Sequence, residues 1–351
     1  MAQQFQPDRW TTPSGYLILT VLLFIVVFAS RSHRLYQSNA MHFPEATEFE
    51  IREPTTVQEF LVQLEKADAR FKEEELLWAS SLFGWRRIQP GYYQFTGGVS
   101  YEEILSRLSL GLQNHKRIFI PSGSRPEDLS GKLGELMKAD SAEFAAMFSD
   151  SSEIAMERGW TGSELFARML PDQYDLYWTW RPEQVVRRIL DEFNKQIDPL
   201  AAAIQDPAYS LEERLTLASI VEWEAGTHDE KPTISGLYLN RLERGMRLQS
   251  DPTILFALGE HRRLYFDDYR LDHPYNTYRI NGLPPGPITN PDIHSLRAAF
   301  EPEEHDYLYM VASPEGRHRF TRTFQEHQDA SRDWRRWLEE QTRLGEESDS
   351  N

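Results

Sequence analysis

The chain has no cysteine among its 351 residues. This absence excludes disulfide bonds and thiolate metal sites, and it fits either a reducing or an oxidising compartment. Positive charge is also scarce, because 55 Asp and Glu residues stand against 38 Lys and Arg residues and give a formal net charge of −17. A surface with this average charge repels DNA and RNA. We therefore expect no nucleic-acid partner.

One long uncharged segment lies near the N-terminus. Residues 10–30 contain no charged side chain, and a stretch of roughly 20 apolar residues is enough to cross a bilayer core. Trp10 and Tyr16 suit one headgroup region and Arg31 the other. A cleaved signal peptide and a buried helix are the alternatives, but residues 29–31 make a poor cleavage site. The sequence favours a membrane anchor, and the balance of flanking charges leaves its orientation open.

Short strands and helices alternate after this segment. A strand is expected at Thr47–Ile51, and Thr56 and Glu59 have capping-box spacing at the start of a helix. A second helix over 72–82 and a strand over 90–95 complete the pattern. The order strand, helix, helix, strand resembles a LysM-type carbohydrate-binding module.

Residues 139–206 are predicted to be mainly helical. They contain an aromatic patch, Leu176-Tyr-Trp-Thr-Trp180. We interpret this patch as core packing rather than as a platform for sugar stacking.

Two carboxylates end a helix that the sequence predicts to be buried. Ser210 and Glu213 form a capping box, and the apolar residues within 215–221 surround the helix. Glu222 and Glu224 follow, each continuing an apolar stripe. Burial raises the pKa of a carboxyl group toward the range of a general acid. Periodicity does not choose between the two glutamates.

Two loops downstream are rich in amides, hydroxyl groups, aromatic rings and prolines. They span residues 274–278 and 282–288 and follow the segment 246–253. Such loops suit a neutral polyhydroxylated ligand, since rings stack on sugar faces and amides pair with hydroxyl groups. A hairpin with strands at 307–312 and 317–323 is expected after them, followed by a last helix.

Six motifs occur in order over this part of the chain. They are Leu217-Ala-Ser-Ile-Val-Glu-Trp-Glu224, Asn240-Arg-Leu with Gly245-Met-Arg-Leu-Gln-Ser-Asp-Pro252, Tyr275-Asn-Thr-Tyr278, Gly282-Leu-Pro-Pro-Gly286, Asp306-Tyr-Leu-Tyr309 and Phe320-Thr-Arg-Thr323 with Glu326-His327. In content, order and spacing they resemble the endolytic murein transglycosylase family (MltG/YceG-like).

The resemblance implies a catalytic residue and a set of substrate ligands. The family's catalytic acid is the second acidic residue of the Ile-Val-Glu-x-Glu motif, which corresponds to Glu224. The implied glycan-groove residues are Gln249, Tyr275, Asn276 and Tyr278, with Ser219, Arg322 and His327 as weaker candidates. The chain departs from the family at Ala225-Gly226, where a threonine is usual, and at Ser250, where threonine is common.

The implied reaction is cleavage, without water, of the β-1,4 bond between N-acetylmuramic acid (MurNAc) and N-acetylglucosamine (GlcNAc), leaving 1,6-anhydro ends. No cofactor is implied. The implied partners are peptidoglycan strands, the lipid bilayer and peptidoglycan synthases. The resemblance also implies a single-pass protein of the bacterial inner membrane, with a cytoplasmic N-terminus and the catalytic domain on the outer side, which terminates nascent strands.

The expected fold class is α+β, with one transmembrane helix, a LysM-like module and a mixed α+β catalytic domain. The expected segments are a cytoplasmic tail (1–15), a transmembrane helix (16–30), a tether (31–46), the LysM-like domain (47–115), a mainly helical connecting region (116–206), the catalytic domain (207–342) and a disordered acidic tail (343–351).

Two other functions compete with this expectation. Glu222, Glu224 and His228 suggest a metal site, because residues four apart share a helix face. However, the sequence has no His-Glu-x-x-His element. The other alternative is a non-catalytic scaffold that binds the cell wall through the LysM-like region. The presence of Glu224 argues against a scaffold.

Overall fold

The structure is a computed structural model that describes residues 13–203 and 208–349. The chain divides into two compact units, of which unit 1 comprises residues 1–116 with 175–179 and unit 2 comprises 117–174 with 180–351. The expected mixed α+β class with an apolar N-terminal helix is confirmed. The finer domain boundaries predicted from the sequence stay predictions, and most of the expected cytoplasmic tail lies outside the described residues.

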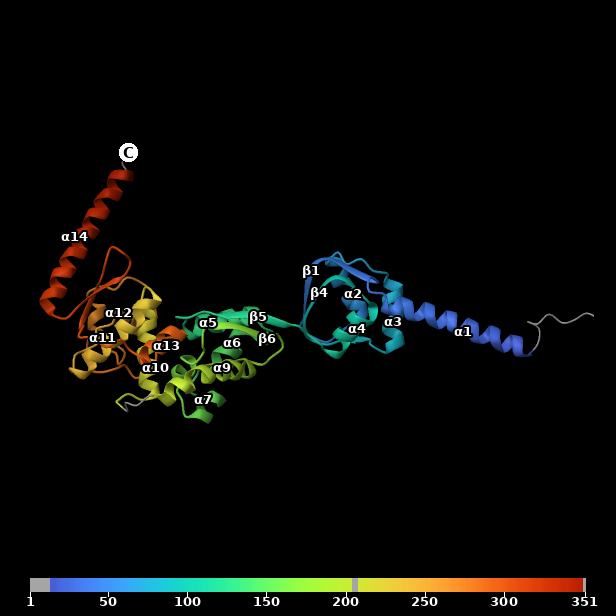
Figure 1. The fold of residues 1–351 in the computed structure, drawn as a ribbon, viewed down its shortest axis with the longest axis horizontal. Helices are drawn as coiled ribbons and strands as arrows, with labels where there is room; N and C mark the ends of the chain where they lie inside the picture. The colour runs from blue at the N-terminus through green and yellow to red at the C-terminus, as the bar shows by residue number, and fades with distance from the viewer. Residues whose placement is uncertain (1–12, 204–207, 350–351) are drawn as a thin grey trace, which may run out of the picture. The chain divides into compact units, whose positions relative to one another are not determined.

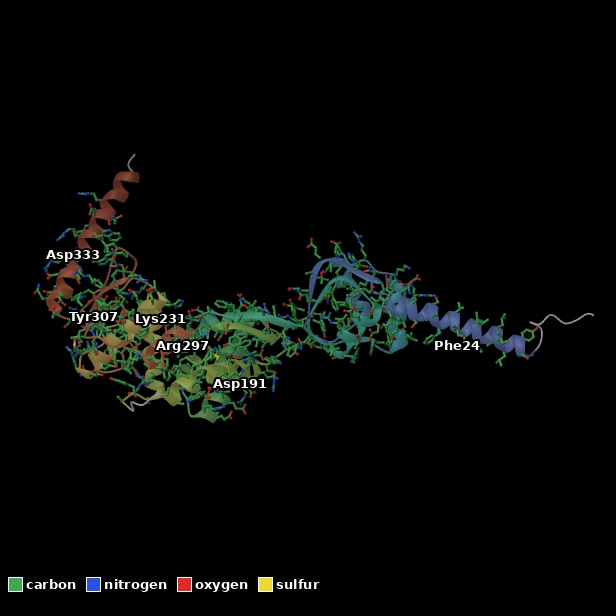
Figure 2. The ribbon with its side chains drawn as sticks, in the orientation of Figure 1. Phe24, Asp191, Lys231, Arg297, Tyr307 and Asp333 are labelled. Carbon is green, nitrogen blue, oxygen red and sulfur yellow. The ribbon has the colours of Figure 1, made fainter. Side chains whose placement is uncertain are left out.

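The apolar segment forms helix α1, Pro13–Tyr36. Its stretch Ser14–Tyr36 has a mean hydropathy of 2.0 and only 6% of its apolar window is buried, so its length and composition are those of a membrane span. Phe24, which is 71% exposed, points away from the ribbon (Figure 2). The helix continues to Tyr36 and residues 41–46 belong to a strand, so the expectation of an irregular tether over 31–46 was wrong for most of that segment.

Unit 1 has the predicted order of strand, two helices and strand. Its elements are β1 (Met41–Ile51), β2 (Thr55–Thr56), α2 (Val57–Lys66), α3 (Glu73–Phe83), β3 (Arg87–Ile88), β4 (Gly91–Val99) and α4 (Tyr101–Leu110). The capping box of Thr56 and Glu59 is confirmed. Strand β1 pairs antiparallel with β4 and begins at Met41 rather than Thr47, with a register shift between Phe43 and Thr47. The shift surrounds a proline, which lacks the N–H that a regular ladder needs, and this local irregularity hid the first half of the strand.

The connecting region combines helices with one strand that the sequence did not reveal. Its elements are β5 (His115–Ile120), α5 (Pro126–Leu136), α6 (Ser141–Met147), α7 (Glu153–Arg158), α8 (Gly162–Phe166), β6 (Asp172–Tyr177) and α9 (Pro182–Ala203). The region is mainly helical, as expected, but strand β6, which pairs with β5, was not predicted. The strand has only six residues, and the first two are both exposed, so its alternating pattern is short. Trp178 directly after β6 is fully buried, as expected for core packing.

The rest of unit 2 is built around α10, Leu211–Glu224. Its other elements are η2 (His228–Glu230), α11 (Lys231–Glu243), α12 (Asp251–Leu258), η3 (Asp268–Arg270), α13 (Ile293–Phe300), β7 (Tyr309–Ala312), β8 (His318–Thr321) and α14 (Phe324–Asp349). Helix α10 packs against α11, α12 and α13, which gather around it in Figure 1. The predicted hairpin forms as β7 and β8.

The acidic tail was expected to be disordered from residue 343. Helix α14 instead continues to Asp349, and residues 350–351 lie outside the described chain.

A pair of glycines in α5 tests how closely α6 packs against it. A Cβ atom at Gly134 would lie 2.4 Å from the Ser141 backbone nitrogen, whereas a Cβ atom at Gly131 meets nothing within 4 Å. We expect Gly134→Ala to lower the free energy of unfolding by about 1–3 kcal/mol, because α6 must shift. Gly131→Ala should raise it by about 0.5–1 kcal/mol, since alanine favours a helix interior. Denaturant unfolding of both variants checks the packing, and equal effects would contradict it.

Candidate active site

The end of α10 carries both carboxylates singled out in the sequence. The helix starts with the predicted capping box, in which the Ser210 hydroxyl accepts the Glu213 N–H and the Glu213 side chain accepts the Ser210 N–H. Every residue from Arg214 to Val221 is buried. Because most of the helix is buried in the core, its last turn is held in a fixed position. Residues two apart on a helix point in different directions, and Glu222 and Glu224 indeed have separate surroundings.

Glu222 belongs to a buried network of hydrogen bonds. Its Oε2 accepts from Lys231 Nζ at 3.0 Å, from the Asp292 N–H at 3.1 Å and from the Ser295 hydroxyl at 2.7 Å. Lys231 also donates to Asp292 Oδ1 at 2.8 Å, and only 4% of its side chain is exposed. A carboxylate oxygen that accepts hydrogen bonds from a cation and two further donors is held in place, which suits a structural role. Glu222 therefore ties the end of α10 to the starts of α11 and α13.

Within the described residues, Glu224 makes one hydrogen bond, and its partner lies at the start of α12. The Ser250 hydroxyl donates to Glu224 Oε2 at 2.9 Å. Ser250 is fully buried, and Thr277 and Thr253 hold it in place: Thr277 Oγ1 accepts its N–H at 3.0 Å, and its carbonyl accepts the Thr253 hydroxyl at 2.7 Å. Threonine also carries a hydroxyl group, so the family departure at this position retains the donor.

Burial raises the pKa of the Glu224 carboxyl group above its ordinary value. The main cause of its raised pKa is loss of solvent, and the negative charge of Asp251 acts in the same direction. The Ser250 hydroxyl lowers the pKa and limits this shift. Tyr238 is buried beside both residues, and burial followed by the charge of Glu224 raises its own pKa well above the usual value. Its hydroxyl group is close enough to influence Glu224, but it reaches full hydrogen-bond geometry with no group in the described part of the chain.

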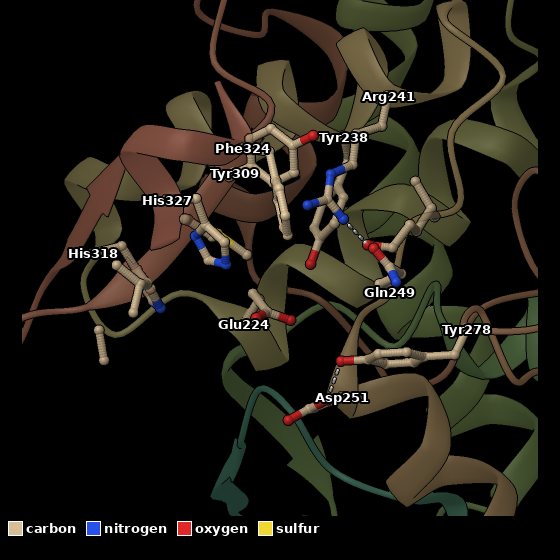
Figure 3. A pocket seen from close by; sticks show the side chains of 14 residues that line it. Glu224, Tyr238, Arg241, Gln249, Asp251, Tyr278, Tyr309, His318, Phe324 and His327 are labelled. Atoms are coloured by element: carbon tan, nitrogen blue, oxygen red, sulfur yellow. Dashed lines mark hydrogen bonds between the residues drawn. The ribbon is translucent and has the colours of Figure 1, made fainter. Parts of the chain in front are cut away.

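Glu224 lines a cavity of about 440 Å³ within unit 2. In Figure 3 its carboxyl group lies beneath Tyr238 and above Asp251 and Tyr278, with His318 and His327 to one side. The lining residues are Glu224, Tyr238, Arg241, Leu248, Gln249, Asp251, Tyr278, Tyr309, Met310, Val311, Ala312, His318, Phe324 and His327. They come from α10, α11, α12, α14, the hairpin and two loops. The hairpin and the loops thus complete the walls of the cavity, and the end of the buried helix α10 supplies Glu224.

The structure brings together three of the seven substrate-binding candidates predicted from the sequence. Gln249, Tyr278 and His327 line the cavity with Glu224. Gln249 adopts a backbone φ of +52°, an uncommon conformation for a residue with a side chain. Tyr278 donates to Asp251 Oδ1 at 2.7 Å. Burial and the charge of the neighbouring Arg241 lower the pKa of His327.

The other four candidates do not line this cavity. Ser219 is fully buried and accepts the Ile288 N–H at 3.0 Å, so it fastens a loop to α10. Asn276 is also fully buried, and its amide donates to backbone carbonyls of its own loop. Tyr275 packs against Phe256, and Arg322 lies over the ring of Tyr307. Their assignment as substrate ligands stays a prediction, and in this structure they support loops or lie on other surfaces.

Sequence reasoning missed Tyr238, Arg241, Asp251, Tyr309 and His318 as cavity residues. Tyr238 lies outside all six motifs quoted for the family resemblance. Arg241, Asp251 and Tyr309 lie inside motifs quoted for the family resemblance, so that signal was available. His318 lies on the predicted hairpin, whose position over the end of α10 depends on tertiary contacts.

The candidate metal set is not assembled in the structure. Glu222 is bound to Lys231, whereas His228 is 65% exposed and lies 3.3 Å from an Asp292 carboxylate oxygen. Within residues 13–203 and 208–349, no group of three or more His, Cys, Asp or Glu side chains has the arrangement of a metal site.

Fold and site together define an α+β protein whose cavity presents one protonatable glutamate, and comparisons with known proteins identify the family. The YceG-like family model matches residues 49–333, and the chain belongs to this family.

Two curated relatives and one solved structure are similar to the chain. The endolytic murein transglycosylase of Bacillus subtilis (strain 168) is 27% identical over 76% of this chain and 79% of its own length. That of Streptococcus pneumoniae serotype 2 (strain D39) is 27% identical over 75% of this chain, which spans about half (53%) of the pneumococcal protein. A crystal structure of a putative YceG-like protein from Listeria monocytogenes is 26% identical, with a TM-score of 0.58 over 81% of this chain and 98% of that one.

The two glutamates should affect stability in opposite directions. Because burial raises the folded-state pKa of Glu224 above its ordinary 4.5, its contribution to stability is full below the unfolded pKa and is lost as pH rises through the folded pKa. Glu224→Gln should therefore raise the melting temperature at neutral pH by about 2–4 °C for each kcal/mol recovered, and the gain should vanish below pH 4. Glu222→Gln should cost about 3 kcal/mol, because Lys231 loses a buried partner. Thermal unfolding across pH measures both, and a destabilising Glu224→Gln would contradict the assignment.

Ser250 should control the ionisation of Glu224. Ser250→Ala removes the hydrogen bond that lowers the Glu224 pKa, so that pKa should rise further. Ser295→Ala removes a donor to Glu222 instead and should leave the titration of Glu224 unchanged. Carboxyl-carbon NMR titration of the labelled protein reads the pKa directly. The interpretation fails when Ser250→Ala lowers the pKa or when Ser295→Ala shifts it equally.

Proposed function

We propose that this protein is a membrane-anchored endolytic lytic transglycosylase that cleaves peptidoglycan glycan strands and leaves 1,6-anhydro-MurNAc ends. The observation that carries the proposal is Glu224, a glutamate with a raised pKa that lines a cavity of about 440 Å³. The curated relatives named endolytic murein transglycosylases support the choice of substrate. The volume lies within the range of about 300–1,000 Å³ that small-ligand sites occupy.

The reaction begins with proton donation by Glu224. The bond between C1 of MurNAc and O4 of GlcNAc breaks, and O4 takes the proton. The carbonyl oxygen of the MurNAc acetamido group forms a bond to C1 and yields a cationic oxazolinium ring. A protonated carboxyl group beside an apolar helix suits this step, because its pKa lies nearer the working pH.

The second step returns the proton to the enzyme. The Glu224 carboxylate removes the proton from the C6 hydroxyl of the same MurNAc while O6 attacks C1, and the bond between C1 and the acetamido oxygen breaks. The products are a 1,6-anhydro ring and a free O4 hydroxyl group, and no water is consumed. The Ser250 hydroxyl bond of 2.9 Å stabilises the carboxylate between the two steps.

Other cavity residues suit a sugar polymer. Tyr278, Tyr309 and Phe324 supply aromatic rings, and Gln249 supplies an amide. Rings stack on sugar faces and amides pair with hydroxyl or acetamido groups. These residues would hold the glycan with its scissile bond over Glu224.

The rest of the chain would bring this site to its substrate. Helix α1 has the length and composition of a single-pass anchor, which would hold unit 2 at the outer face of the cytoplasmic membrane, where nascent strands are made. The strand, two helices and strand of unit 1 would form a LysM-like glycan-binding module. Peptidoglycan synthases would be the neighbours whose products the enzyme terminates.

The proposal is tested with Glu224→Gln in the full-length protein in detergent. Wild-type protein incubated with purified peptidoglycan in ¹⁸O-labelled water should release anhydro-muropeptides that contain no ¹⁸O, because water is not a reactant. Glu224→Gln should lower the rate about 10²–10⁴-fold, as expected for loss of a general acid. Mass spectrometry identifies the products.

Glu243→Gln provides a matched control, since Glu243 is an exposed carboxylate at the end of α11 and lies outside the cavity lining. This variant should retain full activity. Reducing ends that carry ¹⁸O would instead define a hydrolase. Binding of peptidoglycan without any product would favour the non-catalytic scaffold.

A further inference from the structure

The cavity contains a second carboxylate that the proposed reaction has not yet used. Asp251 is the first residue of α12 and directly follows Ser250, the hydrogen-bond donor to Glu224. In the part of the chain that the structure describes, Glu224 and Asp251 are the two carboxylates that line this cavity. Ser250 therefore donates a hydrogen bond to the Glu224 carboxyl group, and Asp251 places a negative charge beside that group.

The two oxygens of Asp251 have unequal surroundings. Oδ1 accepts the Tyr278 hydroxyl at 2.7 Å, whereas Oδ2, among the residues that the structure describes, has one long contact of 3.4 Å with the Tyr269 hydroxyl. The stronger bond fixes the orientation of the carboxylate, and Oδ2 retains capacity to accept another donor. Figure 3 shows Asp251 below Glu224, with the Tyr278 ring beside it.

A helix start is a suitable place for a fixed negative charge. The unpaired N–H groups at the beginning of α12 favour an anion there. Asp251 interacts with tyrosine hydroxyl groups rather than with a cation, and no basic side chain within the described residues lies within ion-pair distance of it. Its charge is therefore not neutralised by an ion pair and acts on whatever occupies the cavity.

The negative charge of Asp251 would stabilise the positive charge that develops in the proposed reaction. When the bond to C1 breaks, positive charge develops on the MurNAc ring and then on the oxazolinium. Glu224 becomes anionic in the same step, but it must next accept a proton from the C6 hydroxyl. A separate anion, fixed in place before the reaction, stabilises the cation without taking part in proton transfer.

We propose that Asp251, oriented by Tyr278, accepts a hydrogen bond from the acetamido N–H of MurNAc through Oδ2 and stabilises the cationic oxazolinium. This inference rests on the proposed function. The acetamido carbonyl oxygen attacks C1 while the N–H points to Asp251, so the growing positive charge on the amide nitrogen strengthens that hydrogen bond. Asp251 neither gains nor loses a proton, and the atoms of the reaction balance as written above. Asp251 is thus a catalytic residue that contacts the substrate, and Tyr278 is a positioning residue.

The same carboxylate in a hydrolase would do something different. A second carboxylate about 6.5–9.5 Å from the acid can activate water, and one at about 5–5.5 Å can attack C1 itself. Both alternatives end with hydrolysis and a reducing sugar. The role proposed here leads to the anhydro product, so product analysis distinguishes the roles.

The test compares Asp251→Asn and Asp251→Glu in the full-length protein. Asp251→Asn should lower kcat about 10²–10³-fold, as for loss of a preorganised charge, while KM changes less than about threefold, because the neutral substrate gains little from the charge. Asp251→Glu should retain more activity than Asp251→Asn. Tyr278→Phe should lower kcat about tenfold, because Asp251 keeps its charge but loses its orientation.

A binding measurement tests the same inference without turnover. The probe is a GlcNAc–MurNAc disaccharide ending in a fused 1,2-thiazoline ring, a stable analogue of the oxazolinium, and titration calorimetry measures its Kd. Asp251→Asn should weaken binding of this probe at least about tenfold while binding of the uncyclised disaccharide stays within threefold. Asp140→Asn, at the start of α6, controls for losing a carboxylate at a helix start, and Tyr265→Phe controls for losing an exposed tyrosine hydroxyl. Both controls should match wild type.

The outcomes separate this inference from the proposed function. Wild type that yields anhydro products, together with an Asp251→Asn variant of normal kcat and normal thiazoline affinity, would overturn the inference alone. Wild type that yields reducing ends labelled by water would overturn both. Melting temperatures identify a variant that has not folded, and in that case the thiazoline affinity of Tyr278→Phe decides.

Discussion

The buried ammonium group of Lys231 holds the site together. It binds Glu222 at the end of α10 and Asp292 at the start of α13, and it is itself the first residue of α11. Removing three charges from water is costly, and the ion pairs and added hydrogen bonds offset that cost only in a favourable geometry. The network therefore adds little to the net free energy of folding, and its main effect is to fix the positions of the helices that it joins. Three helices that meet at one point fix the last turn of α10, and Glu224 lies on that turn.

This arrangement gives two glutamates, two residues apart, opposite properties. Glu222 is surrounded by a cation and two other donors, whereas Glu224 has one hydroxyl donor and faces a cavity. The difference comes from what other segments place beside each residue. A third carboxylate, Asp251, adds a negative charge that disfavours ionisation of Glu224. One site thus places a carboxyl group with a raised pKa beside a second carboxylate with different hydrogen-bond partners, an arrangement by which two carboxyl groups can serve different roles.

Local patterns predicted much of the fold. The capping boxes at Thr56 and Ser210, the buried body of α10 and the final hairpin all follow from spacing within a few residues. The first half of β1 was missed because a proline interrupts its alternating pattern, and strand β6 was missed because it has only six residues. The site was harder to predict. Periodicity left Glu222 and Glu224 equivalent, since the lysine that distinguishes them comes nine residues later and reaches back. The bond between Asp251 and Tyr278 joins residues 27 positions apart, and no local rule specifies such a contact.

The backbone of Gln249 has a further consequence. A φ of +52° suits glycine and costs other residues on the order of 1–2 kcal/mol. Glycine at this position would therefore make a more stable protein. Glutamine instead places an amide against the cavity, next to the dipeptide that serves Glu224. This cost in folding free energy falls on a residue whose side chain lines the cavity, and it agrees with the role in holding the glycan that is proposed for Gln249 above.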